Sequence, residues 1–355
     1  AAGISGAAEP STLTTGMNGG NFTKEYTDMF TKDGTLMVAF ISSAHAFGYN
    51  KALFKEAGIS EPPKTWDEAI EDAKLINNPD KQITGYATLA AEWTEWFFQY
   101  YVWQAGGDLT KENEDGTAEL TFTDPAVIEA AKYYQRLRSE GVLQSDLTLK
   151  FSDLVTNFGL GKIGMMPFAG DWVSEAAANG IDPDDIGLSL PPAGPSEDRT
   201  TAIAGICYVI NAKKTSEKDA AWEYIKYYCS KEYLSSYFEN LATKGAPNPV
   251  IIPRDDMSVT DFYDFPEEKT VLEEAKSVGR LEFYGKADFG SYVDRAVQKI
   301  LVDPMLTLKG FAEAQKQCES EALPAFNEAN KDNGQLLAQS LWRSAGIYSC
   351  AFSCL

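Results

Sequence analysis

Three tryptophans fall within eleven residues of this sequence, at a spacing that could serve ligand binding. Trp93, Trp96 and Tyr100 recur at the intervals that place side chains on one face of a helix, and Trp103 falls near the same stripe. Flat apolar rings beside carboxylates such as Glu95 suit a ligand with both apolar C–H faces and hydroxyls, as sugars have. From the residues alone, packing of this stripe in a hydrophobic core is the favoured interpretation, and ligand contact is the alternative.

A fourth tryptophan lies in the tripeptide Gly170-Asp171-Trp172. The tripeptide follows the apolar run 163–168, which is typical of an interior strand. The carboxyl ends of strands in open α/β sheets face the ligand crevice, so we expect Trp172 at that edge. Asp171 could accept ligand hydroxyls there, or it could cap a helix N-terminus.

Metal and nucleophile chemistry has few candidates in this sequence. His45 is the single histidine, whereas zinc sites usually draw several ligands from His and Cys together. It is also the one partner available for a Ser-His or Cys-His pair, and we expect it to be an ordinary strand or pocket residue. The five cysteines form no C-x-x-C motif. We therefore expect no metal site and no cofactor.

Charge and length narrow the class of protein. The chain has 31 Lys and Arg against 52 Asp and Glu, a formal charge of −21, which repels phosphate backbones and anionic lipids. Nucleic-acid binding is therefore not expected. The 355 residues exceed the size of about 250–300 residues at which one hydrophobic core stops growing, so we expect two lobes.

Short apolar runs alternate with helical patterns, which is typical of an α/β fold. The expected strands are residues 35–43, 163–168, 186–190 and 203–210. The expected helices are residues 51–58, 65–77, 125–141, 215–230, and 292–323 with a break at Asp303-Pro304. At the start of the second helix, Thr65 and Glu68 fit a capping box, with Glu68 reaching back to the cap.

Several segments resemble one protein family. Residues 48–58 read GYNKALFKEAG and residues 62–68 read PPKTWDE. Residues 93–109 read WTEWFFQYYVWQAGGDL, and residues 158–172 contain FGLGKIGMM and GDW. These segments resemble the extracellular solute-binding proteins of ATP-driven importers, specifically the sugar-binding group that includes maltose-binding protein.

The resemblance implies a two-lobe, periplasmic-binding-protein-like α/β fold that closes about a hinge. It implies an N-terminal lobe of residues 1–42 and 205–266, a C-terminal lobe of residues 43–204 and 267–341, and an unassigned tail, 342–355. Hinge crossings are expected near residues 38–43, 202–206 and 255–266. Fewer residues precede Tyr49 than in the family, so we expect the N-terminal lobe to lack its opening elements.

The resemblance also implies binding of a mono- or oligosaccharide without catalysis. Counting back from Gly106-Gly107, Trp96 falls where the family places a sugar-stacking aromatic, and Trp172 becomes the second platform. The full set of expected ligand-binding residues is Trp96, Trp172, Trp93, Asp171, Glu95 and Asn248. The expected partners of this monomeric carrier are the membrane permease subunits of an ABC importer. Its expected location is extracytoplasmic, with a lipid anchor possible in the full-length precursor.

Other functions compete with this interpretation. A glycoside hydrolase would need two carboxylates about 5–10 Å apart, one with a raised pKa. The same fold could bind ferric iron through adjacent tyrosines, a polyamine or a peptide. The tyrosine pairs are 100–101, 133–134 and 227–228, and because helical neighbours point apart we expect them to pack rather than bind iron.

Overall fold

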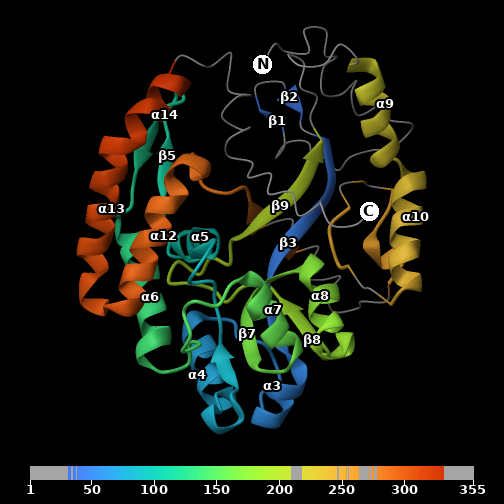
Figure 1. Cartoon of the computed structure of the whole chain (residues 1–355), viewed down its shortest axis with the longest axis horizontal. Helices are drawn as coiled ribbons and strands as arrows, with labels where there is room; N and C mark the ends of the chain where they lie inside the picture. The colour runs from blue at the N-terminus through green and yellow to red at the C-terminus, as the bar shows by residue number, and fades with distance from the viewer. Residues whose placement is uncertain are drawn as a thin grey trace.

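The computed structural model describes residues 31–32, 35–36, 38–208, 218–245, 248–252, 254, 256–263, 271, 274–275 and 278–331. A mixed sheet runs through the middle of this part of the chain, with groups of helices on either side of it (Figure 1). The architecture is α/β, as the alternation of apolar runs and helical patterns predicts.

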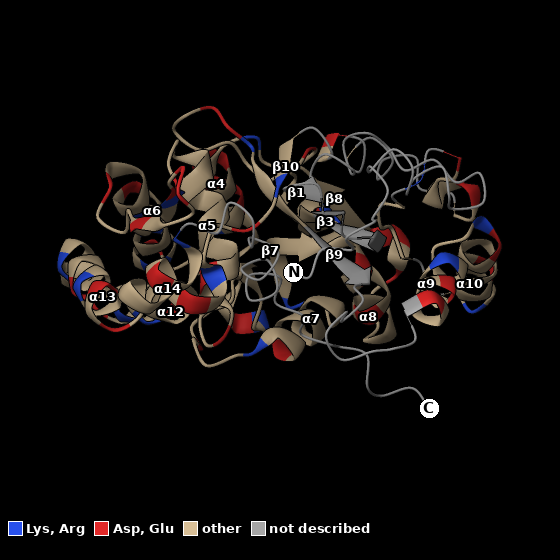
Figure 2. Cartoon of the chain, turned by 90° about the horizontal axis from the view of Figure 1, so that it is seen from above, with Lys and Arg blue, Asp and Glu red and all other residues tan. Residues whose placement is uncertain are grey.

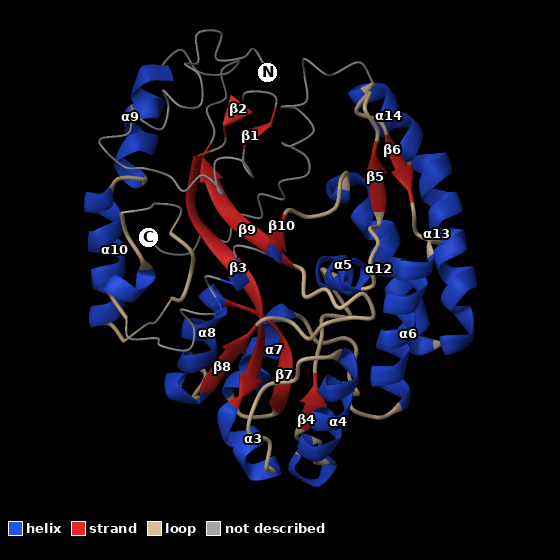
Figure 3. Ribbon diagram, turned by 180° about the vertical axis from the view of Figure 1, so that it is seen from behind, coloured by secondary structure: helices blue, strands red, loops and turns tan. Residues whose placement is uncertain are grey.

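Strand β3 (Val38–Asn50) is the backbone of the main sheet (Figure 3). Its first half pairs antiparallel with β9 (Thr201–Tyr208), with Ala44 opposite Ile203. Its second half pairs antiparallel with β7 (Ile163–Ala169) and β8 (Ile186–Ser189). The sheet is extended by β4 (Thr84–Tyr86), parallel to β7, and by β10 (Gly279–Arg280), parallel to β9. One long strand thus links two portions of the sheet.

The predicted strands are present with shifted ends. The segment 35–43 forms β2 (Thr35–Leu36) and the start of β3, which continues seven residues further, to Asn50. Its extension has few of the β-branched residues that signal a strand, so pairing with β7 and β8 determines its conformation. Strand β7 is buried along its whole length, as an apolar run between helices requires. Residues 209–210 of the predicted fourth strand lie outside the described residues.

Local capping explains the first two described helices. Helix α3 (Lys51–Ala57) ends at Gly58, whose φ of 76° is the left-handed conformation that glycine adopts readily. Helix α4 (Trp66–Ile76) begins where Thr65 Oγ1 accepts the Glu68 N–H at 3.2 Å. The other half of the predicted capping box is wrong, because Glu68 Oε2 accepts the N–H of Lys64 at 2.6 Å instead of that of Thr65.

The break predicted at Asp303-Pro304 is confirmed, because a 3₁₀ turn at 304–306 separates two long helices there. The other α-helices described are α5 (Thr94–Gln104), α6 (Pro125–Ser139), α7 (Phe151–Gly159), α8 (Val173–Ala178), α9 (Lys218–Tyr228), α10 (Lys231–Thr243), α12 (Lys286–Val302), α13 (Thr307–Glu321) and α14 (Leu323–Asn330). The 3₁₀ turns are η1 (Pro79–Lys81), η2 (Gly170–Trp172), η3 (Pro183–Asp185), η4 (Val259–Asp261) and η5 (Pro304–Leu306). Two short hairpins pair β1 (Thr31–Lys32) with β2, and β5 (Thr110–Glu112) with β6 (Ala118–Leu120).

Buried apolar side chains form three clusters among the described residues. The first joins α4, α5, α6, α12 and α13, around residues such as Phe98 and Phe311. The second lies between α5, α7, β7 and β8, around Phe97 and Phe168. The third packs α9 and α10 against residues 250–252, 257 and 259, around Phe238. Lys, Arg, Asp and Glu are distributed over the outer helices, including α13 and α10 (Figure 2).

Candidate functional site

His45 brings the two predicted platform residues into one aromatic cluster. It lies on β3 opposite Ala169 of β7, while Trp96 is in the first turn of α5 and Trp172 ends η2. The imidazole centroid is 5.2 Å from the Trp96 ring and 6.1 Å from the Trp172 ring, both in edge-to-face geometry. Both indoles therefore contact one side chain of the central strand.

Three phenylalanines support the Trp172 ring. Its centroid lies 4.6 Å from that of Phe151, 5.4 Å from Phe168 and 5.8 Å from Phe97. Each contact is edge-to-face, an arrangement that aromatic pairs favour. Trp172 nevertheless remains only partly buried, as does Trp96. Both indoles thus combine a fixed orientation with accessible surface, which a stacking platform requires.

The imidazole between these rings is neutral. His45 is almost fully buried, and burial lowers its pKa from 6.5 to about 3. Trp96 Nε1 donates to His45 Nδ1 at 3.5 Å, which places the imidazole proton on Nε2. The residue types alone predict only an ordinary strand or pocket residue at position 45, because they do not show that this strand passes between α5 and η2.

Glu95 belongs to a buried group of charged side chains beside Trp96. Its carboxylate lies 3.1 Å from Lys286 Nζ, and Glu282 approaches the same ammonium group at 3.5 Å. The Glu95 N–H donates to Asp294 Oδ1 at 2.9 Å. The structure therefore places Glu95 next to the predicted platform, with its carboxylate already engaged by a cation.

Burial and neighbouring charges shift the pKa values of this group in opposite directions. Burial, followed by the contact with Glu95, raises the pKa of Asp294 to about 8. Burial alone would raise the pKa of Glu95, but its interaction with Asp294 and the charge of Lys286 hold it below the ordinary value. Near neutral pH, Asp294 is therefore protonated and Glu95 ionised.

Asp171 and Asn248 lie near each other at the end of β7. A Cβ added to Gly170 would lie 1.7 Å from the carbonyl oxygen of Pro249, so these two chain segments touch. Asp171 and Asn248 also act on Tyr237. Burial is the main cause that raises the pKa of Tyr237; a hydrogen bond from Asn248 lowers this pKa, and the negative charge of Asp171 raises it further. Asp171 is exposed and caps neither η2 nor α8 through its side chain, so the alternative helix-cap role does not apply.

Trp93 and Trp103 do not share the environment of Trp96. Trp93 precedes α5 with a left-handed φ of 49° and is exposed, so the prediction that it continues the helical stripe is wrong. Its ring contacts Phe151 at 5.8 Å, which still places it near the Trp172 support. Trp103 is buried, stacks on Tyr100 and donates to Asp108 Oδ1 at 3.1 Å, as expected of a packing residue.

The described tyrosine pairs give no support to an iron site. Both members of the pairs 100–101 and 133–134 are buried in the core, and Tyr100 and Tyr101 belong to different apolar clusters, so the expectation that these rings pack is confirmed. In the part of the chain that the structure describes, no cluster of three His, Cys, Asp or Glu side chains could hold a metal ion. No described helix is long and apolar enough to cross a bilayer.

Comparison with known proteins identifies the family. Residues 12–234, more than half of the chain, match the family model described as bacterial extracellular solute-binding protein. The chain belongs to this family. The family assignment made from the sequence motifs is thereby confirmed, and membership places this solute-binding protein outside the cytoplasm.

Individual relatives agree with this assignment. A putative binding protein of Brucella abortus is 32% identical over 228 residues, which cover 62% of this chain and 53% of the relative. The diacetylchitobiose binding protein of Streptomyces coelicolor is 27% identical over 188 residues, covering 52% and 43%. The solute-binding protein described here thus spans about half the length of the curated relatives it matches.

The fold has counterparts among solved structures. A maltose-bound binding protein of T. maritima superposes with a TM-score of 0.68 at 21% identity, covering 88% of this chain and 79% of the other. At this identity the likeness concerns the fold alone. It confirms the predicted two-lobe, periplasmic-binding-protein-like architecture for the solute-binding protein.

Proposed function

We propose that this protein binds a carbohydrate between the indoles of Trp96 and Trp172 and delivers it to the permease subunits of an ABC importer. One observation carries the site: both partly buried indoles contact the same neutral imidazole, that of His45. Aromatic rings held in this way can stack on the apolar faces of a sugar ring. Family membership and the maltose- and diacetylchitobiose-binding relatives support the choice of ligand class.

Polar groups around the rings would bind the sugar hydroxyls. Asp171 is an exposed carboxylate next to Trp172, and Asn248 lies close by on the segment that touches Gly170. Trp93, which precedes α5, would extend the aromatic surface beyond the N-terminus of that helix. In this proposal β3 and β9 belong to the hinge between a lobe of residues 43–204 and 267–341 and a lobe of residues 1–42 and 205–266, with 342–355 outside both. The carrier acts as a monomer.

A hydrolytic function fits the carboxylates less well. Hydrolysis of a glycoside needs two carboxyl groups separated by about 5–10 Å, with the scissile bond between them. Glu95 and Asp294 have the opposite pKa shifts that such a pair would show, yet they interact directly with each other. No glycosidic bond fits between groups in contact. We therefore expect no turnover when the protein is incubated with oligosaccharides, as followed by chromatography.

A thermal-shift screen tests the binding function. A ligand that binds only the folded state raises the melting temperature by mass action. The panel contains maltose, maltotriose, N,N′-diacetylchitobiose, D-tagatose and ribitol, with sn-glycerol 3-phosphate and spermidine as charged comparisons. We expect a rise with at least one neutral sugar or polyol. A rise with only a charged compound would contradict the carbohydrate assignment.

Alanine substitutions test the site itself. Trp96→Ala and Trp172→Ala should each lower the affinity for the best panel sugar by about tenfold or more, equivalent to about 1.4 kcal/mol of stacking. Isothermal titration calorimetry measures this change. The control is Tyr227→Ala, which removes an exposed ring from α9 and should leave affinity unchanged. Unchanged affinity in both tryptophan variants would remove these residues from the site.

A further inference from the structure

Lys286 lies against the ring of Trp96. Its Nζ is 4.8 Å from the indole centroid, within the range of a cation–π contact. Only 13% of the Lys286 side chain is exposed, so this contact is shielded from water. Because an ammonium group attracts the face of an indole, one face of Trp96 is taken by Lys286.

Two carboxylates hold the ammonium group in this position. Lys286 is the first residue of α12, where the helix dipole disfavours a positive charge. Glu95 at 3.1 Å and Glu282 at 3.5 Å supply the compensating negative charge. Burial alone would lower the pKa of Lys286, but these carboxylates outweigh burial and raise it, so the side chain stays charged. Glu282 and Glu95 reach it from the segment before α12 and from α5, respectively.

Residues in the next two turns of α12 contact Glu95. Lys286, Gly290 and Asp294 are spaced four residues apart and so share one face of the helix. Asp294 Oδ1 accepts the Glu95 N–H at 2.9 Å. A Cβ at Gly290 would lie 3.1 Å from Glu95 Cγ, tighter than ordinary contact, so glycine leaves the room that Glu95 occupies. Glu95 of α5 and Glu282, which precedes α12, therefore fix the Lys286 ammonium group over the Trp96 indole.

We propose that Lys286 is a positioning residue for ligand binding: it holds Trp96 by one face, so that the sugar stacks on the opposite face. This inference rests on the proposed function, because it assigns Trp96 to the sugar site. The role of Glu95 in this inference differs from the direct ligand contact that the sequence predicts. Glu95 acts through Lys286, because its Oε1 lies 3.1 Å from the ammonium group and only 8% of its side chain is exposed.

A measurement without ligand tests the positioning. Protein labelled with 5-fluorotryptophan gives ¹⁹F resonances for its seven tryptophans, and Trp96→Phe identifies the one from position 96. Lys286→Met keeps the length of the side chain and removes its charge. We expect the Trp96 resonance to shift and broaden in Lys286→Met and to recover in Lys286→Arg. Lys299→Met, on the same helix at an exposed ion pair, is the matched control and should leave that resonance unchanged.

A double-mutant cycle tests the link to affinity. The probes are maltose and N,N′-diacetylchitobiose, measured by calorimetry. We expect Lys286→Met to weaken binding by about threefold to tenfold, as loss of a shielded cation–π contact would. The effect should disappear in a Trp96→Ala background. An undiminished effect in that background would mean that Lys286 touches the sugar directly and would overturn the positioning role.

The outcomes separate this inference from the proposed function. If Trp96→Ala weakens binding and Lys286→Met changes neither the ¹⁹F resonance nor the affinity, the inference alone is wrong. If Lys286→Met moves the resonance and Trp96→Ala leaves affinity unchanged, Trp96 is outside the sugar site. The positioning role of Lys286 and the proposed place of the sugar between the two indoles are then both wrong. Should Lys286→Met not fold, because two buried carboxylates lose their cation, the charge-balanced variant Lys286→Met with Glu282→Gln takes its place.

Discussion

At the scale of single residues, the neutral histidine at the centre of the aromatic cluster is the most informative group. His45 sits between two indoles with its proton on Nε2, and burial holds its pKa near 3. A charged imidazole in the same place would carry a proton on Nδ1 and could not accept from Trp96. The geometry of the cluster therefore depends on His45 remaining uncharged.

This dependence predicts how stability changes with pH. The pKa of His45 is about 3 in the folded state and about 6.5 when unfolded, so only the unfolded state takes up the proton as the pH falls. Between about pH 6.5 and pH 5, we expect this group to reduce the free energy of unfolding by up to about 1.4 kcal/mol per pH unit. Urea titrations at several pH values measure the change.

The control for the acid effect is His45→Gln, which cannot titrate, so the difference in the free energy of unfolding between the two proteins isolates the His45 contribution from that of Asp294, whose raised pKa acts in the opposite direction over the same interval. NMR provides an independent check, because the chain contains a single histidine and its ring signals need no assignment. The imidazole should remain neutral across the whole interval. A titration midpoint near 6.5 would show that His45 is exposed to water and that the cluster is open.

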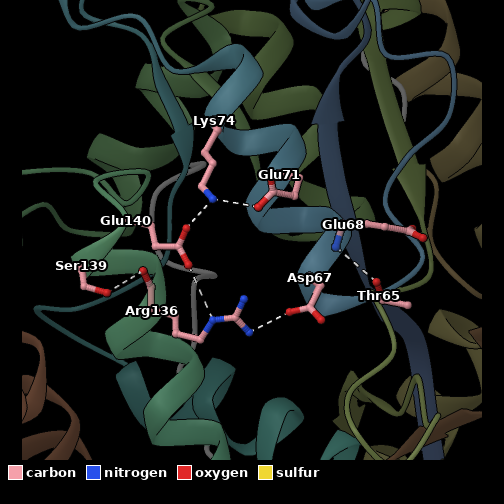
Figure 4. Close-up of polar contacts among 8 residues, drawn as sticks. All are labelled: Thr65, Asp67, Glu68, Glu71, Lys74, Arg136, Ser139 and Glu140. Carbon is pink, nitrogen blue, oxygen red and sulfur yellow. Dashed lines mark hydrogen bonds and ion pairs between the residues drawn. The ribbon is translucent and has the colours of Figure 1, made fainter.

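At the scale of elements, two kinds of contact join α4 to α6. Exposed ion pairs form the first kind: Arg136 binds Asp67 at 2.7 Å, and Lys74 lies between Glu71 and Glu140 (Figure 4). The second kind is buried. Trp66 stacks on Tyr133 at 4.5 Å and donates to Gln104 Oε1 at 2.8 Å, which also ties α4 to α5. Solvent screens the first kind of contact and not the second.

Substitutions should separate these contributions. Trp66→Ala should lower the free energy of unfolding by about 3–5 kcal/mol, because it leaves a large cavity and an unpaired buried amide oxygen. Arg136→Ala should lower it by less than about 1 kcal/mol, because its partners are exposed. Chemical denaturation measures both. A larger loss for Arg136→Ala than for Trp66→Ala would mean that the exposed ion pairs, not the stacked rings, hold α4 in place.

Element ends were predictable where a local signal determines them. Gly58 ends α3, and Thr65 begins α4, through contacts with residues only a few positions away. Sequence spacing failed for Trp93, because its left-handed backbone takes it out of the helix that its neighbours begin. It also failed for Glu68, whose target depends on the backbone of residues 64–66 pairing with the distant Ala193. Tertiary contacts decide such cases.

At the scale of the whole molecule, the candidate site combines residues that are remote in sequence. Motifs identified Trp96 and Trp172, whereas His45 and Lys286 emerged only once β3 and α12 were placed beside α5. Glu95 and its partner Asp294 are 199 positions apart, so no local pattern could connect them. The family and its fold were thus predictable from sequence, but the groups that orient the rings were not.

The contact between Gly170 and Pro249 provides a further test of this arrangement. Gly170 follows β7, whose Phe168 belongs to the second cluster, while Val250 belongs to the third. A Cβ at position 170 would overlap the Pro249 carbonyl oxygen, 1.7 Å away. A methyl group there must separate the two segments and displace Trp172, which ends the same turn. The position therefore couples packing between clusters to the proposed platform.

Gly170→Ala should lower the free energy of unfolding by about 1–3 kcal/mol, the usual effect of overpacking. It should also weaken sugar binding, because both Trp172 and the neighbouring Asn248 would move. Denaturation and calorimetry measure the two effects. The control is Gly310→Ala in α13, where the nearest atom is 3.7 Å from the added Cβ and helix propensity favours alanine by up to about 1 kcal/mol. If Gly170→Ala proved as stable and as tightly binding as Gly310→Ala, the segments around Gly170 and Pro249 would not be in contact, and the two polar residues beside them would not share one site.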